Sequence, residues 1–428
     1  MSGPDGGAEA ARDPVAAYRR RMRPWRIGYA AGVVVLVAVA LLVVKIAYSH
    51  GEISHATLRT AAAPAPSLTP AQPATAVTAA WRTGDRVAIG APVWGGTVVT
   101  YSAHSVTGRD DVTGAVRWQY TRTDRTVCTA AQISGVTVAV YRLAGNCDEV
   151  TALNSGTGAR DWTRTLDKDG HPLNGQATYS VTPYTLMIAS HSAIYAIDPV
   201  SGLDRWVFDQ PGCTIRGAVL GSSGALISQD CSHPVCGSSQ KYCGKGVQLL
   251  LRDATEGENS DDATNPSKIK WNLLGNDLTP ACADGVICAV RPGTERLALF
   301  DVASGKELAP LPLSTPAGAT AQVSAYDHGD LVWTGGVTYA VRESGSGYLW
   351  TAPTPVLPTV SALSGQQPPA LSGAVIAVPG GDGVQMLSPD TGAVTRTVAV
   401  PGASGATTVA VLGHGLLVSG PSGTVAYR

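Results

Sequence analysis

The repeat unit of this chain is clearest in Ile194-Tyr-Ala-Ile-Asp-Pro-Val-Ser-Gly-Leu-Asp-Arg-Trp206. The apolar run that opens it is typical of a half-buried strand. Asp198 can cap the following turn with its side chain, and Gly202 supplies the positive φ that such a turn needs. Each copy therefore predicts a strand, a turn and a second strand. Related copies run from Glu149 to Trp162, from Leu297 to Gly305 and from Val384 to Gly392.

Tryptophans mark the period of this repeat, and Leu308 and Arg396 hold the equivalent place in two weaker copies. These eight marks divide the chain into units of roughly 40 residues, the length that four short antiparallel strands and one propeller blade require. A large ring at the same place in successive blades is expected to pack between neighbouring sheets. The six tryptophans expected to do so are Trp81, Trp118, Trp162, Trp206, Trp271 and Trp350.

The two ends of the array complement each other. Residues 79–84 resemble the last strand of a blade that has no earlier strands, and residues 423–428 resemble the third strand of a blade that stops there. Pairing of these two segments would close the ring and leave no open sheet edge. The sequence therefore predicts an all-β fold over residues 77–428, an eight-bladed β-propeller of four-stranded antiparallel blades.

An Asp-x-x-x-Gly turn with a tryptophan four residues later, as in Asp110, Gly114 and Trp118, resembles the pyrroloquinoline-quinone-like (PQQ-like) propeller repeat. The resemblance covers about residues 77–428. Quinoprotein alcohol and glucose dehydrogenases share this repeat with the non-enzymatic propeller lipoprotein of outer-membrane assembly. It therefore implies the fold and leaves the function open.

The segment before the propeller has three expected parts. Residues 1–26 carry six arginines and are expected to form a cytoplasmic tail, and residues 27–48 are apolar enough for a transmembrane signal-anchor helix. Residues 49–76 are rich in Ala and Pro, which predicts an extended extracytoplasmic linker. A cleaved signal peptide is the alternative, but no Ala-x-Ala cleavage site directly follows the apolar run. The small-residue stretch Thr-Ala-Ala-Ala at residues 60–63 lies further along the chain.

Eight cysteines all follow the apolar segment, which indicates disulfides in an oxidising compartment. Their positions around hairpin turns favour pairing in sequential order, although eight cysteines allow 105 pairings. A zinc site from Cys231, Cys236 and Cys243 with His233 is the alternative, because zinc accepts thiolate and imidazole ligands. The eight disulfide candidates are Cys128, Cys147, Cys213, Cys231, Cys236, Cys243, Cys282 and Cys288.

No residue is nominated as catalytic, cofactor-binding or metal-binding. The sequence disfavours a quinone site. It lacks the adjacent cysteine pair of many alcohol-oxidising quinoproteins and the long insertions that cap their active sites. The acidic stretch between Leu251 and Trp271 could ligate calcium, but it lacks the order of a known calcium loop. It is therefore interpreted as a solvated insertion.

These features predict a non-catalytic binding or scaffolding module of the bacterial cell envelope. Its expected location is the cell membrane, crossed once, with the N-terminus in the cytoplasm and the propeller outside. A protein or an envelope polymer is the expected partner, and the net charge of −1 argues against nucleic acid. Two alternatives stay open: a PQQ-dependent dehydrogenase, and the ligand-sensing ectodomain of a membrane signalling complex.

Overall fold

The computed structural model describes residues 29, 31–42, 45, 52–66, 72–143, 145–166, 173, 176–234, 244–253, 268–318, 320–326, 329–362, 374–380, 383–403 and 405–428. The chain divides into two compact units, Met1–Ala56 and Thr57–Arg428.

In the first unit, residues 31–42 are helical and their side chains are exposed, and a short helix α2 spans Glu52–His55. Within the described residues, no helix is both long enough and apolar enough to cross a membrane. The predicted span of residues 27–48 lies partly outside the described residues, so the anchor remains a prediction.

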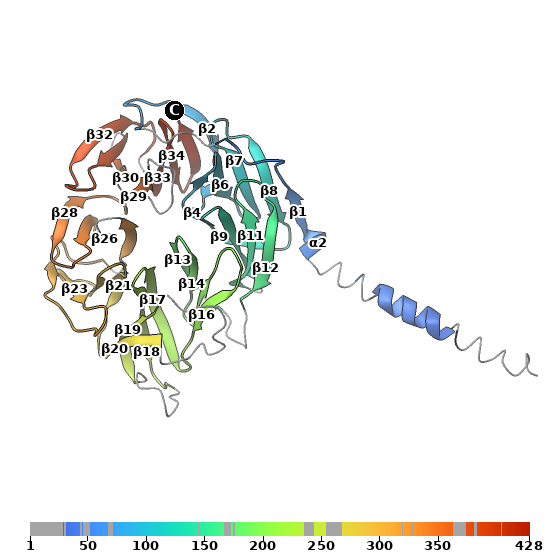
Figure 1. Ribbon diagram of the computed structural model, residues 1–428, viewed down its shortest axis with the longest axis horizontal. Coiled ribbons are helices and arrows are strands. Elements are labelled where there is room, and N and C mark those ends of the chain that lie inside the picture. Colours follow the sequence, from blue (N-terminus) through green and yellow to red (C-terminus); the bar gives the residue numbers. More distant parts are fainter. Residues whose placement is uncertain are drawn as a thin grey trace, which may run out of the picture. The chain divides into compact units, whose positions relative to one another are not determined.

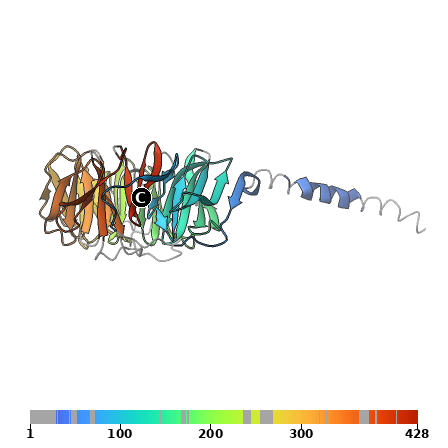
Figure 2. The same cartoon turned by 90° about the horizontal axis from the view of Figure 1, so that it is seen from above.

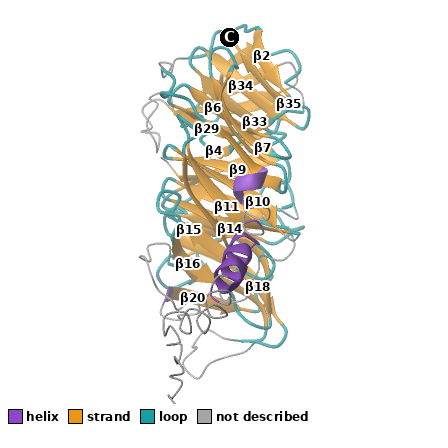
Figure 3. Cartoon of the chain, turned by 90° about the vertical axis from the view of Figure 1, so that its right-hand side faces the viewer, coloured by secondary structure: helices purple, strands orange, loops and turns teal. Residues whose placement is uncertain are grey.

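The second unit is a ring of eight sheets around a centre (Figure 1), and from above it forms a flat disc (Figure 2). Strands make up most of it, with loops at both ends of the sheets (Figure 3). This confirms the predicted all-β, eight-bladed propeller. Six of the sheets have four strands in the described part of the chain, while the other two gain further strands.

Blades 3 to 7 are simple antiparallel meanders that follow the chain. Their strands alternate in direction, so the first and third turns of each blade lie at the same end of its sheet. We call the face of the ring formed by these ends the turn face. Blade 3 contains β13 (Thr178–Thr182), β14 (Thr185–Ala189), β15 (Ile194–Ile197) and β16 (Asp204–Phe208); blade 4 contains β17 (Cys213–Gly221), β18 (Gly224–Cys231), β19 (Gly246–Arg252) and β20 (Ile269–Leu274); blade 5 contains β21 (Thr279–Cys282), β22 (Ile287–Val290), β23 (Arg296–Phe300) and β24 (Leu311–Pro312); blade 6 contains β25 (Gln322–Tyr326), β26 (Gly329–Thr334), β27 (Val337–Arg342) and β28 (Tyr348–Pro353); blade 7 contains β29 (Thr359–Ala362), β30 (Ala374–Gly380), β31 (Gly383–Leu387) and β32 (Val394–Ala399).

Blade 8 closes the ring with strands from both ends of the propeller sequence. The N-terminal strand β2 pairs antiparallel with the C-terminal strand β35, and Trp81 lies opposite Ala426. Main-chain hydrogen bonds between Thr78 and Arg428 extend this pairing by one residue. The strand around Trp81 therefore completes the last blade, as the sequence predicts. Blade 8 contains β33 (Thr408–Leu412), β34 (Gly415–Gly420), β35 (Gly423–Tyr427) and β2 (Ala79–Thr83).

Blades 1 and 2 are wider than the predicted four strands. In blade 1 the first strand is broken into short pieces, and β1 adds to the outer edge beside β8. In blade 2, β4 adds to the innermost strand β9 in parallel. Blade 1 contains β1 (Ala56–Arg59), β3 (Arg86–Val87), β5 (Val93–Trp94), β6 (Thr97–Tyr101), β7 (Ser105–Asp110) and β8 (Val116–Arg122); blade 2 contains β4 (Ile89–Gly90), β9 (Thr126–Ile133), β10 (Val136–Leu143), β11 (Asn146–Asn154) and β12 (Arg160–Thr165).

Part of the range expected as a linker, residues 49–76, is packed on the propeller. Ala61 donates its main-chain N–H to Thr157 of blade 2, and Arg117 of blade 1 donates to the carbonyl of Ala63. Ala74 donates its N–H to the carbonyl of His414, and Ala76 forms a parallel bridge with Ala399. These contacts hold residues 57–66 and 72–78 against the blades, so the propeller unit begins before residue 77.

Candidate binding surface

The third turn of most blades is fixed by the side chain that begins it. In blade 3, Asp198 Oδ1 accepts the N–H groups of Val200 at 2.8 Å and Ser201 at 3.0 Å. Asn154 does the same in blade 2. In blade 5 the hydroxyl and N–H of Ser304 lower the pKa of Asp301, because both donate to its carboxylate. The predicted Asp or Asn cap therefore has a direct physical basis.

Each turn of this kind also receives the tryptophan of the preceding blade. Trp118 of blade 1 is fully buried and donates its indole N–H to the carbonyl of Ser155 in blade 2, at 2.8 Å. Its ring lies against Gly158, whose φ is 73°. The indoles of the other blades donate in the same way: Trp81 to Asp111 (3.2 Å), Trp162 to Pro199 and Val200 (3.1 Å each), Trp271 to Val302 (3.0 Å) and Trp350 to Pro389 (2.7 Å).

Trp206 of blade 3 departs from this pattern. Its side chain is buried, but its indole N–H has no acceptor within the described residues. The guanidinium of Arg252 in blade 4 lies 5.1 Å from the ring centroid instead. The turn that would receive Trp206 falls in residues 254–267, which are outside the described residues together with the carboxylates of the predicted acidic insertion. Asp253 at its edge pairs with Lys270 at 3.7 Å.

In the described part of the chain, three disulfides each lie within a single blade, and each joins cysteines that are neighbours in the sequence, as expected. The bonded pairs are Cys128–Cys147 in blade 2, Cys213–Cys231 in blade 4 and Cys282–Cys288 in blade 5. Since Cys231 is bonded to Cys213, it cannot act as a zinc thiolate, and that alternative loses one of its ligands. Cys236 and Cys243 lie outside the described residues.

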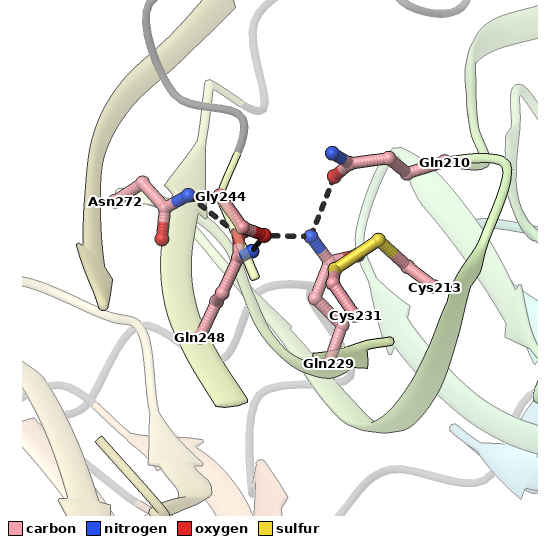
Figure 4. The surroundings of a disulfide bond; sticks show 7 residues. All are labelled: Gln210, Cys213, Gln229, Cys231, Gly244, Gln248 and Asn272. Carbon is pink, nitrogen blue, oxygen red and sulfur yellow. Dashed lines mark hydrogen bonds between the residues drawn. A yellow bond between two sulfur atoms is a disulfide. The ribbon is translucent and has the colours of Figure 1, made fainter. Parts of the chain in front are cut away.

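Buried amides cross blade 4 beside its disulfide (Figure 4). Gln229 donates to Gln210 at 2.6 Å and to Gln248 at 3.3 Å, and Asn272 donates to Gln248 at 2.7 Å. Gln248 in turn donates to the carbonyl of Gly244. Gln229 and Gln248 are fully buried. This ladder joins β18, β19 and β20 to the segment before β17 and to the β18–β19 loop, and only its ends at Gln210, Gly244 and Asn272 are partly exposed.

A buried ion-pair network joins blade 1 to blade 2. Arg122 is 1% exposed and binds Glu149, and it also binds Asp124 at 3.0 Å. Arg125 pairs with the same two carboxylates. Burial opposes the charge of Arg122, but the bonds to Asp124 and Glu149 outweigh it and raise the pKa of the guanidinium. All charges here are compensated, as buried ions require.

Exposed apolar side chains gather on the turn face of blade 3. Tyr184 is 68% exposed, Val200 65% and Leu203 45%, and we call these three residues the blade 3 patch. Tyr184 lies in the first turn and the other two in the third turn. The carbonyl of Tyr184 accepts a bond from Arg205 Nε at 3.1 Å, and Arg205 pairs with Asp198 at 2.6 Å. The two turns are therefore held side by side.

The backbone under this patch is fixed from below. Val200 donates its N–H to the cap Asp198, and its carbonyl accepts the indole N–H of Trp162. Both of its main-chain groups are therefore bonded, while its side chain is 65% exposed. The sequence analysis did not single out these residues. The available signal was an apolar residue inside a polar turn, in the Pro-Val-Ser-Gly segment 199–202.

The described residues contain no cluster of His, Cys, Asp or Glu side chains suited to a metal ion. His104 bonds to the carbonyl of Arg125 through Nδ1 at 2.7 Å. The blade 3 patch offers contact area and no nucleophile or acid–base pair. An apolar patch on a rigid support is suited to binding a partner.

The fold and this surface define a disulfide-stapled propeller whose turns carry exposed apolar groups. The family model described as outer membrane protein assembly factor BamB matches residues 16–207 and 74–308. Together these ranges cover more than half of the chain, so the chain belongs to this family of PQQ-like propellers.

No curated protein matches the sequence of this chain. Several solved structures are similar to it at low sequence identity. BamB from Moraxella catarrhalis is 17% identical with a TM-score of 0.46, over 82% of this chain and 99% of that one. The computationally designed Ika8 protein is 13% identical with a TM-score of 0.48, over 85% and 99%. A europium-containing methanol dehydrogenase is 13% identical with a TM-score of 0.45, over 80% and 84%.

Proposed function

We propose that this protein is a membrane-anchored, extracytoplasmic propeller that acts as a non-catalytic binding or scaffolding module in the cell envelope. The observation that carries the binding role is the blade 3 patch, in which three exposed apolar side chains stand on turns that are held by main-chain and side-chain hydrogen bonds. A surface held in this way loses little conformational entropy when a partner covers it.

The location is proposed from two features of the sequence and one of the structure. An apolar segment follows six arginines, and every cysteine lies after it. The three described disulfides favour an oxidising compartment for the propeller. The family description, an outer membrane protein assembly factor, favours a protein partner over a polymer.

A photo-crosslinking residue at Val200 in the full chain, expressed in its membrane, tests the binding role. We expect one adduct of discrete mass from Val200. The matched control is Leu274, which is 57% exposed and lies at the opposite end of blade 4. The same adducts from both positions, or none from Val200, would contradict a partner site at the blade 3 patch.

The dehydrogenase alternative has its own test. The full chain in detergent is mixed with pyrroloquinoline quinone and Ca²⁺, and retained quinone is measured by its absorption after gel filtration. We expect no retention above a serum albumin control. Stoichiometric retention would replace the proposed function with a quinoprotein activity.

The anchor is tested separately. We expect the full chain to stay in the membrane pellet after alkaline carbonate extraction, and a chain lacking residues 1–48 to become soluble. External protease should digest the propeller of intact spheroplasts and spare an epitope placed before residue 12. Release of the full chain by carbonate would contradict the anchor without affecting the binding role.

A further inference from the structure

A carboxyl group is buried without compensation where blades 5 and 6 meet on the turn face. Asp330, the second residue of β26, is 0% exposed, and neither of its carboxyl oxygens has a hydrogen-bond partner of normal geometry within the described residues. The backbone N–H of Asp284 is the donor that faces it. Buried carboxylates in proteins are normally paired or bonded, so this group needs an explanation.

The carboxylates around Asp330 further disfavour its ionisation. Asp284, in the first turn of blade 5, and Glu343, just after β27, both repel a charge on Asp330. Tyr326 of β25 also faces Asp330, and Arg342 and Asp390 act on that tyrosine in turn. Burial raises the pKa of Asp330 well above its usual value, and Asp284 and Glu343 raise it further against the opposing N–H.

Besides facing Asp330 of blade 6, Asp284 also contacts blade 4. Its Oδ1 accepts the N–H of Ser222 in the first turn of blade 4. The neighbouring Gly285 donates its N–H to Ser223 Oγ at 3.1 Å, and Ser223 donates its own N–H to Ala283 at 3.0 Å. The turn of blade 5 therefore joins blade 4 on one side and Asp330 of blade 6 on the other.

The contact between the first turn of blade 5 and blade 6 is tightly packed. A Cβ added to Gly285 would overlap the side chain of Glu343. Asp284 is half-buried and Glu343 is exposed, so solvent lies close to the pair although Asp330 itself is covered. A negative charge on Asp330 could be relieved by separating these turns, which would admit water to the carboxylate.

We propose that Asp330 is a proton-operated latch: neutral Asp330 allows the turns of blades 4, 5 and 6 to pack together, and its ionisation separates them and opens this part of the turn face. The folded pKa is raised, so the packing that depends on neutral Asp330 is fully present at acid pH and is lost as the pH rises through the folded pKa. The latch is thus closed in acid and opens toward alkaline pH. It is a regulatory device additional to the proposed function and does not depend on it.

Hydrogen–deuterium exchange of the full chain in detergent tests this latch between pH 5 and 9, with rates corrected for intrinsic exchange. In the wild type we expect protection of the amides of residues 283–287 and 329–332 to fall by about tenfold or more as the pH rises, one pKa unit of coupling. D330N should keep that protection at every pH, because its amide cannot ionise. Amides of residues 136–140 in blade 2 are the internal control.

A second variant keeps the test decisive if D330N does not fold. E343Q removes one repelling charge from an exposed position and so lowers the pKa of Asp330, which should make the loss of protection smaller and complete at lower pH. E307Q, which removes an exposed carboxylate of blade 5 not implicated in the latch, should leave the profile unchanged. Protection independent of pH in the wild type, or the same profile in the wild type and E343Q, would overturn the latch.

Discussion

Gly158 of blade 2 lies directly against the indole of Trp118 of blade 1. A Cβ added to Gly158 would lie 2.6 Å from Cβ of Trp118, closer than side chains approach one another. A Cβ added to Gly202 would lie 2.6 Å from Cδ2 of Trp162, and one added to Gly392 would lie 2.6 Å from Cδ2 of Trp350. The turn glycine and the tryptophan thus form one interlock that is repeated around the ring, and either residue alone would not explain the repeat.

Gly158→Ala should therefore destabilise the propeller by more than the cost of its backbone conformation. Positive φ alone costs an alanine about 1–2 kcal/mol, and the overlap with Trp118 should add about 1–3 kcal/mol. Gly293→Ala is the matched control, because its φ of 78° is similar but no atom lies within 4 Å of the added Cβ. Chemical denaturation measures both variants. Equal losses would show that the indole contact contributes nothing.

Trp118 and Trp206 separate packing from hydrogen bonding. Both are buried, but only Trp118 has an acceptor for its indole N–H within the described residues. Trp118→Phe leaves the carbonyl of Ser155 unpaired, whereas Trp206→Phe breaks no such bond. We expect Trp118→Phe to cost about 1 kcal/mol more in unfolding free energy than Trp206→Phe. An equal or reversed order in denaturant titrations would contradict the role of the bond.

The sequence predicts the ring well because its signals are local and repeated. The Asp cap, the turn glycine and the tryptophan lie within one short segment, and their spacing alone defines a blade. Arg396, expected at a tryptophan position, lies opposite Met386, where Trp350 lies opposite Ala340 in the preceding blade. Pairing of β2 with β35 was predictable because each end lacks what the other supplies.

The remaining features depend on contacts between distant residues. The extra strands β1 and β4 carry no repeat signal, and their pairing follows from exposed backbone edges of β8 and β9. Residues 57–66 read as an open linker because Ala and Pro bury little surface, yet they dock through main-chain bonds. The blade 3 patch is defined by the exposure of its three side chains, and Asp330 is defined by a buried carboxyl group without a hydrogen-bond partner among the described residues. Neither property can be read from the linear sequence.

Removing the disulfide of blade 4 should weaken that blade. Cys213 and Cys231 are 18 residues apart and join the open end of the β17–β18 hairpin. A loop of this size corresponds to about 3 kcal/mol in the chain-entropy account. We expect C213A/C231A to lose roughly that stability and to lose exchange protection at Gln229 and its neighbours. The pair C282A/C288A, whose loop has a separation of only 6, should lose less. The reverse order would contradict the loop-size argument.

Ring closure should depend on pH through Asp111, which is 1% exposed beside Trp81 and Arg428. Burial raises its pKa to about 6 from 3.8, against the opposing charge of Arg428. The folded state therefore holds this proton more tightly than the unfolded state. The resulting stability is complete below pH 3.8 and is lost as the pH rises through 6. The loss amounts to at most about 3 kcal/mol.

Asp111→Asn should remove this pH-dependent loss of stability, because the amide is uncharged at every pH. We expect the variant to be more stable than the wild type at pH 7.5 and to approach it near pH 4, in denaturation curves measured across that range. The difference between the two proteins isolates Asp111 from all other titrating groups. Asp277→Asn, which removes an exposed partner of Arg216, is the control for the loss of a carboxylate away from the ring closure. A constant difference between wild type and Asp111→Asn from pH 4 to 7.5 would show that the carboxyl at the ring closure is already charged in the folded state.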